Sequence, residues 1–80
     1  MSKKKIEVEI KSLISKIFNI TVKKISSSTT SKDIPKWDSI GQIRLILLIE
    51  SKYKIKINQK MYDNLLSLDK IVKYLKKHNK

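Results

Sequence analysis

The 80-residue sequence predicts a small all-α protein: a four-helix bundle of three main helices and one short helix, with a long first loop. Residues 3–18 and 68–75 carry apolar residues at helical spacing. Residues 39–52 are rich in apolar residues and follow a good helix-capping residue. A chain of this length buries roughly 60–65% of its unfolded surface. We therefore expect one domain over residues 1–80.

The first helix is predicted to run from about Lys3 to Phe18. Lysines fall mainly outside its apolar positions, which is typical of an amphipathic helix with one buried stripe. Asn19 is a reasonable residue for its end. The stripe consists of Ile6, Ile10, Leu13, Ile14 and Ile17.

Residues 19–37 form a long connection. Its Ser/Thr run at 26–31 and Pro35 favour turns over helix. A loop this long in a compact domain is usually functional or mobile. Trp37 either fills one end of the helix bundle or contacts a group attached to the nearby Ser39. The apolar residues that could pin the loop over the core are Ile20, Val22, Ile25 and Ile34.

The second helix is predicted from Ser39 to about Lys52, with Asp38 as its N-cap. Ser39 takes the first helical position, where free amides and the helix dipole favour an anion. An Asp-Ser step here is a plausible place for a phosphate ester. Gly41 costs helix propensity, and we expect its missing side chain to let another molecule approach Ser39.

This helix is apolar on two sides. One side should enter the core and contains Gln42, Leu45, Ile46, Ile49 and Tyr53. A different side contains Ile40, Ile43 and Leu47, with Arg44 among them. The second side either binds a partner or is buried by a four-helix arrangement, and the sequence leaves both open.

The rest of the chain supplies a loop and two helices. Residues 52–57 alternate like a strand, but no partner strand is evident, so we expect an extended loop that buries Ile55 and Ile57. Residues 58–66 should form a short helix or turn, contacting the core through Met61, Leu65 and Leu66. Ser67 is expected to cap the last helix. Its predicted buried stripe is Leu68, Ile71, Val72 and Leu75, with Tyr74 at the edge and fraying from about His78.

The amino-acid composition limits the kinds of chemical site that the chain can contain. The chain has no cysteine, which excludes disulfides, thiolate nucleophiles and Cys-based zinc sites. Its one histidine, His78, has no carboxylate or second histidine near it in sequence, so we predict no metal site. There is no signal peptide pattern and no transmembrane run, and the expected location is the cytoplasm. The net charge of +12 suggests nucleic acid, an anionic membrane or an acidic protein as partner.

The order of these elements resembles the acyl carrier protein family. The family pattern of Asp-Ser-Leu, an amphipathic helix, an aromatic residue and alternating isoleucines is matched over nearly the whole chain. The residues that carry the resemblance are Asp38-Ser39-Ile40, then Leu45, Ile46, Ile49, Glu50, Tyr53, Ile55 and Ile57, and the segment 67–75. The Trp-Asp-Ser form with Gly41 is more similar to free-standing carriers of specialised pathways, including the D-alanyl type, than to the housekeeping fatty-acid carrier.

The resemblance implies a carrier rather than an enzyme, with no catalytic residue of its own. Ser39 would be the attachment point of 4′-phosphopantetheine, added from coenzyme A by a phosphopantetheinyl transferase, and Asp38 would cap the helix beside it. The arm would hold acyl or aminoacyl groups as thioesters for partner enzymes, for example in lipid or secondary-metabolite biosynthesis.

The chain departs from the family in its charge. Family members are usually acidic and dock on basic patches, whereas here Arg44 stands where an acid is common. We therefore expect partners with acidic or apolar docking faces. The docking residues on this chain should be Ile40, Ile43, Arg44 and Leu47. We also expect the protein to be a monomer.

Two other functions compete with the carrier hypothesis. The alternative is a small basic nucleic-acid-binding helical protein, although no basic stripe interleaved with aromatic residues supports it. A membrane-surface protein would use the basic last helix, but the core explains that helix's apolar stripe better. We expect neither nucleic acid binding nor stable membrane insertion.

Overall fold

The computed structural model describes residues 3–78 and confirms the all-α prediction. These residues contain three α-helices: α1 (Lys3–Phe18), α2 (Ser39–Tyr53) and α3 (Leu68–His78). In the same part of the chain, three short 3₁₀ helices connect them: η1 (Val22–Lys24), η2 (Ser31–Asp33) and η3 (Gln59–Asn64). Within residues 3–78, β-pairing is limited to one isolated bridge between Thr30 and Ser67.

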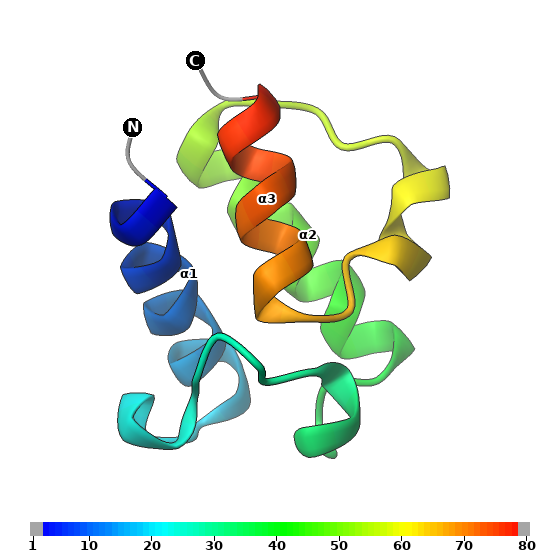
Figure 1. Cartoon of the computed structure of the whole chain (residues 1–80). Helices are drawn as coiled ribbons and strands as arrows, with labels where there is room; N and C mark the ends of the chain where they lie inside the picture. Colours follow the sequence, from blue (N-terminus) through cyan, green and yellow to red (C-terminus); the bar gives the residue numbers. More distant parts are fainter. Residues whose placement is uncertain (1–2, 79–80) are drawn as a thin grey trace.

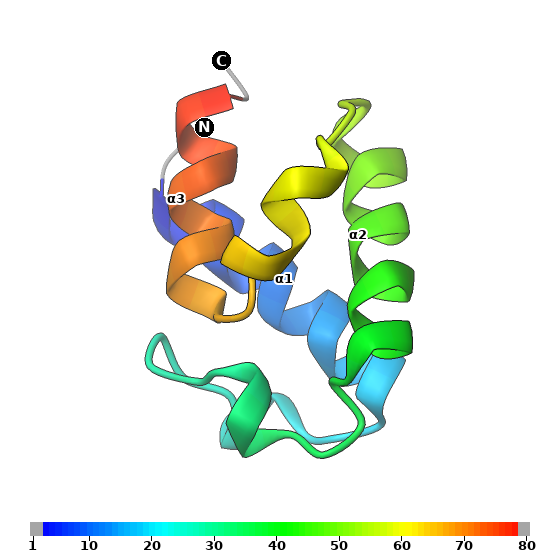
Figure 2. The same cartoon turned by 90° about the vertical axis from the view of Figure 1, so that its right-hand side faces the viewer.

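The helices pack around one apolar core. Helix α1 contacts both α2 and α3 and runs roughly antiparallel to them (Figure 1). The segment η3 contacts α2 and lies across the side of the molecule where α2 and α3 face each other (Figure 2). The fully buried side chains of the core are Ile6, Ile10, Ile14, Leu45, Ile46, Ile49, Leu68, Ile71, Val72 and Leu75.

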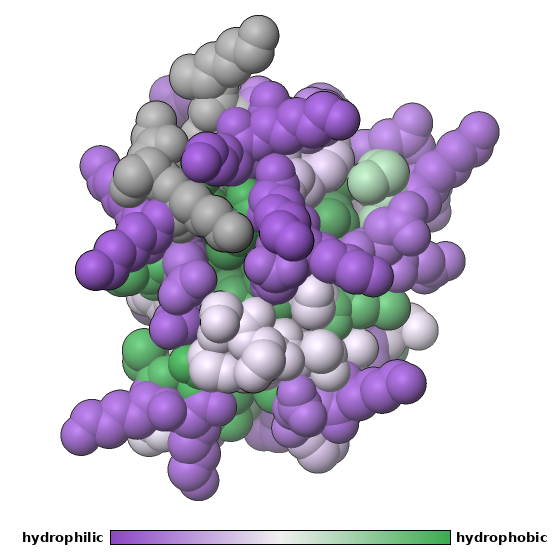
Figure 3. Space-filling model, in the orientation of Figure 1, coloured by the Kyte–Doolittle hydropathy of each residue, from purple (hydrophilic) through white to green (hydrophobic). Residues whose placement is uncertain are grey.

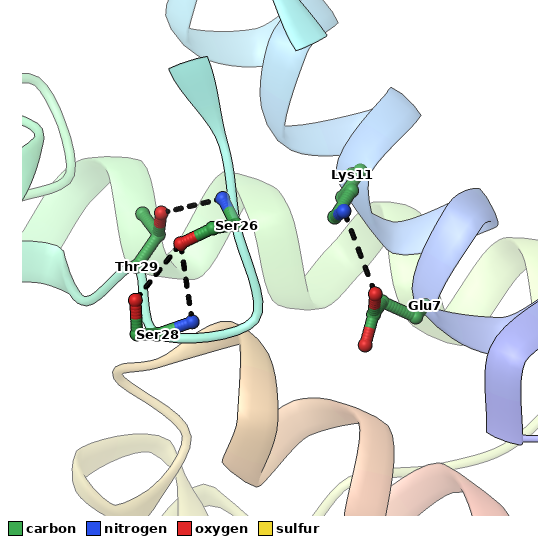
Figure 4. Close-up of polar contacts among 5 residues, drawn as sticks. All are labelled: Glu7, Lys11, Ser26, Ser28 and Thr29. Carbon is green, nitrogen blue, oxygen red and sulfur yellow. Dashed lines mark hydrogen bonds and ion pairs between the residues drawn. The ribbon is translucent and has the colours of Figure 1, made fainter. Parts of the chain in front are cut away.

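Helix α1 has the predicted bounds and most of the predicted stripe. Three of its isoleucines are completely buried and Phe18 closes the stripe, whereas Leu13 and Ile17 are only partly buried. Asn19 ends the helix in the left-handed conformation, with φ of 54°. On the outer face, the Lys11 ammonium lies 3.4 Å from the Glu7 carboxylate (Figure 4).

The connection from α1 to α2 is a series of turns held by its Ser/Thr side chains. Thr29 Oγ1 accepts a hydrogen bond from the Ser26 amide at 2.8 Å, and the Ser26 and Ser28 hydroxyls lie 2.9 Å apart (Figure 4). Ile25 and Ile34 are buried as predicted, and Ile20 is partly buried. The prediction was wrong for Val22, which lies in η1, a short helix without buried residues.

This loop is fastened to the start of α3. The Ser31 amide donates to the Leu66 carbonyl at 2.8 Å, and the Leu68 amide donates to the Thr29 carbonyl at 3.0 Å. These two bonds fix the position of the loop under the bundle, so the long connection has a defined path into α2.

The segment after α2 is the extended loop that the sequence predicted. Lys54 turns the chain in the left-handed conformation, with φ of 55°. The Glu50 carboxylate accepts a 2.7 Å bond from the Ile57 amide, which helps to hold Ile57 in the core. Ile55 is only partly buried.

Tyr53 joins α2 to α1. Its hydroxyl donates a 2.6 Å hydrogen bond to Glu9. Burial, followed by this hydrogen bond and the negative charge of Glu9, raises the pKa of Tyr53. A phenol is protonated at neutral pH in any case, and the raised pKa lets Tyr53 keep donating to the carboxylate at more alkaline pH.

Helix α3 buries the predicted stripe. Ser67 Oγ accepts from the Lys70 amide at 3.2 Å, as expected of a cap, and Asp69 pairs with Lys73 at 3.1 Å. His78 is helical and its ring packs on Tyr74 with centroids 4.3 Å apart, so the predicted fraying does not begin there. The remainder of the predicted tail, 79–80, lies outside the described residues.

The surface is dominated by charged side chains. Long hydrophilic side chains project around the face seen in Figure 3, with apolar side chains visible between them. None of the helices within residues 3–78 combines the length and the apolar character needed to cross a membrane.

Candidate functional site

The candidate site is the N-terminus of α2. Asp38 is extended, with φ of −97° and ψ of −165°, and its Oδ1 accepts a 2.9 Å hydrogen bond from the Gly41 amide. The predicted N-cap is therefore confirmed. Ser39 follows as the first helical residue and is exposed. Among residues 3–78 its hydroxyl has no hydrogen-bond partner, so the oxygen is available to a modifying enzyme.

An open groove of about 290 Å³ lies beside Ser39. It runs between the start of α2 and η3, and we call it the Ser39 groove. Its lining mixes polar and apolar side chains, including one free-standing carboxylate, that of Asp63. The lining residues are Ser31, Trp37, Asp38, Ser39, Gln42, Ile43, Tyr62, Asp63 and Leu66.

Gln42 is the polar centre of this groove wall. Its side chain is only 4% exposed. Its amide nitrogen donates to the Tyr62 carbonyl at 2.7 Å and to the Leu65 carbonyl at 2.9 Å. Its amide oxygen accepts from Trp37 Nε1 at 2.6 Å. The sequence placed Gln42 on the core face but gave no hint of its partners, two of which lie 20 and 23 positions away.

Trp37 has the structural role that was one of the two predicted alternatives. It is 3% exposed and stacks on Phe18 with ring centroids 5.7 Å apart. The ring thus closes the end of the bundle between α1 and α2. Because Trp37 also lines the Ser39 groove, it connects the core directly to the site.

Gly41 corrects one prediction. We expected its missing side chain to open a path to Ser39, but Gly41 is buried against its own chain. A Cβ there would lie 2.4 Å from the Lys36 carbonyl oxygen and 2.8 Å from the Phe18 ring. The glycine is therefore needed because the loop backbone and Phe18 approach the helix closely, and not because a partner does.

Replacing Gly41 with alanine should destabilise the protein. Alanine gains about 1 kcal/mol in helix propensity, but overpacking against a backbone carbonyl costs about 1–3 kcal/mol. We expect Gly41→Ala to lower the urea midpoint by an amount equivalent to up to about 2 kcal/mol. The control is Ser12→Ala on the exposed side of α1. A variant more stable than the wild type would contradict the close approach.

The second side of α2 is exposed, so its apolar residues are not buried by the other helices within residues 3–78. Ile40 is 71% exposed, Ile43 46% and Leu47 55%, and Arg44 between them is also exposed. The bundle does not cover this side. Leu48, which the sequence analysis did not single out, is 40% exposed. We call these four apolar side chains the α2 apolar face: Ile40, Ile43, Leu47 and Leu48.

The acidic side chains are mostly engaged inside the molecule. Six of the seven bond to a neighbour within residues 3–78, as caps, ion pairs or acceptors: Glu7, Glu9, Asp33, Asp38, Glu50 and Asp69. The exception among those residues is Asp63, in the Ser39 groove. The one acid of α2, Glu50, accepts from the Ile57 amide, so the exposed side of this helix is basic and apolar.

A second, smaller groove of about 250 Å³ flanks α2 on its other side, toward the end of α1. Ile17, Ile40 and the aromatic ring of Phe18 give it an apolar part, and Lys36 and Arg44 give it positive charge. Within residues 3–78 no cluster of His, Cys, Asp and Glu could hold a metal ion.

The start of α2 offers the exposed hydroxyl of Ser39 at the positive end of the helix dipole. A phosphate ester is electrostatically favoured at this position.

No protein-family model matches the chain. Two curated proteins are similar to it over nearly its full length. The acyl carrier protein of Buchnera aphidicola subsp. Schizaphis graminum is 35% identical over 75 residues, covering 94% of this chain and 95% of that protein. The acyl carrier protein of Brachyspira hyodysenteriae is 32% identical over 73 residues, covering 90% of this chain and 94% of that protein.

Proposed function

The chain belongs to the acyl carrier protein family, and we propose that it carries acyl or aminoacyl thioesters on a 4′-phosphopantetheine arm attached to Ser39. The family consists of carriers and not of enzymes, so the chemistry on the cargo belongs to partner enzymes. The proposed unit is one monomeric carrier domain over residues 1–80, acting in the cytoplasm.

The observation that carries this proposal is the exposed Ser39 at the capped start of α2, whose hydroxyl makes no hydrogen bond within residues 3–78. In the modification, Ser39 Oγ forms a bond to the pantetheine-bearing phosphorus of coenzyme A as the pyrophosphate P–O bond breaks. Adenosine 3′,5′-bisphosphate leaves, and the proton of the serine hydroxyl passes to a base of the transferase. Asp38 holds the first turn of α2 in place while Ser39 reacts. The arm supplies a thiol, which a chain without cysteine lacks.

The proposal is tested by incubating the purified protein with coenzyme A and a promiscuous phosphopantetheinyl transferase. Intact-mass spectrometry should show complete conversion to a species heavier by one arm. A protein that stays unmodified with several such transferases would count against the proposal.

The partners that we propose have acidic or apolar docking faces. The α2 apolar face surrounds Arg44 and lies next to Ser39, where any enzyme that reaches the arm must approach. Because the exposed side of α2 carries no free acid, an enzyme with a basic docking face would be repelled. The net charge of +12 is thus assigned to protein partners rather than to nucleic acid.

Reversing the charge of Arg44 should slow modification by a transferase from the organism that makes this protein. Charges at the rim of an interface act mainly on the association rate. We expect Arg44→Glu to lower kcat/KM by about 3–10-fold at low salt, with the difference shrinking as salt screens the charges.

The matched control is Lys52→Glu, which makes the same charge change at the other end of α2. An equal loss in both variants would show that only the net charge matters. A faster reaction of Arg44→Glu would mean that the docking face of the transferase is basic, contrary to the proposal.

A further inference from the structure

The route from Ser39 toward the core is closed by hydrogen bonds. Gln42 lies one turn of α2 beyond Ser39, and both line the Ser39 groove. Its three side-chain bonds reach Trp37 and the end of η3, at distances of 2.6, 2.7 and 2.9 Å. In Figure 2, η3 lies between α2 and α3, so these bonds join α2 to the segment that covers that side.

The neighbouring sides of the groove are fixed in the same way. The Ser31 amide donates to the Leu66 carbonyl, and both residues line the groove. Behind this wall the core is shielded from solvent: Leu45 and Ile46 on α2 are completely buried, and Leu65 is 2% exposed. Every buried side-chain polar atom of the described residues has a hydrogen-bond partner.

An aliphatic chain could reach the core from this groove only by separating α2 from η3. That movement would break both hydrogen bonds of the Gln42 amide nitrogen. The Leu65 carbonyl would lose this donor, and the Tyr62 carbonyl would keep only the 3.3 Å bond from the Leu65 amide. A hydrocarbon cannot replace any of those bonds, and unsatisfied polar groups in apolar surroundings are costly. The groove itself is open and partly polar, through Ser31, Tyr62 and Asp63.

We propose that Gln42 is a specificity-determining residue, a polar latch that keeps the cargo outside the bundle, so that this chain serves short or polar acyl groups rather than long aliphatic ones. The inference rests on the proposed attachment of the arm to Ser39. Gln42 acts through Trp37 and η3 and takes no part in the chemistry.

The first test uses the wild-type protein with its arm loaded with either an acetyl or a dodecanoyl group. Methyl NMR should show no acyl-length dependence for core residues such as Leu45, Ile46 and Leu75, and both forms should have the same Tm. Shifts throughout these core methyls, or a higher Tm for the dodecanoyl form, would overturn the inference. Intact mass of the loaded samples separates this result from failure of the arm to attach, which would refute the proposed function instead.

A second test needs no arm. The chain has no cysteine, so Ser39→Cys creates a unique thiol. This thiol can be alkylated with N-methyliodoacetamide or with N-dodecyliodoacetamide. We again expect equal Tm values and unchanged core methyl signals for the two alkyl lengths. Stabilisation by the dodecyl group alone would show that a chain anchored at residue 39 does enter the core.

Replacing Gln42 should make the Tm depend on the length of the alkyl group attached at residue 39. In the Ser39→Cys background, Gln42→Ala breaks all three bonds and leaves space beside η3. The dodecyl form should then have a higher Tm than the methyl form and altered core methyl signals. The matched control, Gln59→Ala, removes an exposed glutamine from η3 and should leave the protein independent of alkyl length. Continued independence in a folded Gln42→Ala protein would overturn the role of Gln42. If that variant does not fold, the wild-type and Ser39→Cys results decide.

Discussion

Ser39→Ala is expected to abolish addition of the 4′-phosphopantetheine arm completely, because the alanine side chain has no oxygen to form the phosphate ester. Ser39 is exposed and its hydroxyl makes no bond within residues 3–78, so its removal should leave the fold intact. Intact mass after incubation with coenzyme A and a transferase measures the loss. Circular dichroism should give the wild-type spectrum.

Ser51→Ala is the matched control for this variant. Ser51 is also exposed and lies on the same helix, near its other end. It should be modified as fully as the wild type. An arm that persists in Ser39→Ala, or one that disappears in Ser51→Ala, would place the attachment at a residue other than Ser39.

The largest loss of stability is expected from Trp37→Ala. Trp37 is buried, stacks on Phe18 and donates to Gln42. Removing a buried aromatic side chain of this size costs about 3–5 kcal/mol. Because small domains are stable by only about 5–15 kcal/mol, the variant should be close to unfolding at room temperature. Urea unfolding followed by circular dichroism measures the difference without relying on tryptophan fluorescence.

Trp37→Phe separates the contribution of the ring from that of the indole N–H. Phenylalanine can keep the stacking on Phe18 but leaves the Gln42 oxygen without its donor, at a cost of about 1–3 kcal/mol. The expected order of stability is therefore wild type, then Trp37→Phe, then Trp37→Ala. A Trp37→Ala protein as stable as the wild type would show that the ring does not close the bundle.

The sequence predicted the helices well because each carries its own local signals. The bounds of α1 and the start of α2 follow from apolar spacing and from Asp38 as a cap, and both are confirmed. The buried stripe of α3 is confirmed as well. The position of Ser39 at the start of α2 was predicted in the same way, since it depends only on the adjacent cap. Its role as the attachment residue was implied by the family resemblance and stays a prediction.

Features that depend on distant contacts could not be predicted. Gln42 finds two of its three partners 20 and 23 positions along the chain, and no local pattern identifies them. Gly41 was misinterpreted because the close approach of Lys36 and Phe18 appears only in three dimensions. The only signal for Gln42 was a single polar residue on an otherwise apolar face, which indicates a buried hydrogen-bond network when the face enters a core.

The exposed side of α2 was undecided for the same reason. Its apolar residues fit burial by a fourth long helix as well as binding to a partner. The short helix between α2 and α3 is η3, which contacts α2 from the groove side and leaves Ile40 and Leu47 exposed. The exposure of this side of α2 therefore depends on the short length of η3, a different segment of the chain.

The carrier function is tested most directly on the protein purified from the cells that make it. Intact mass should show a single arm, free or carrying cargo, and fragmentation should locate it on the peptide that contains Ser39. Hydroxylamine should release any cargo and leave the arm in place, as expected of a thioester. A native protein without an arm, or with the arm on a peptide lacking Ser39, would contradict the account.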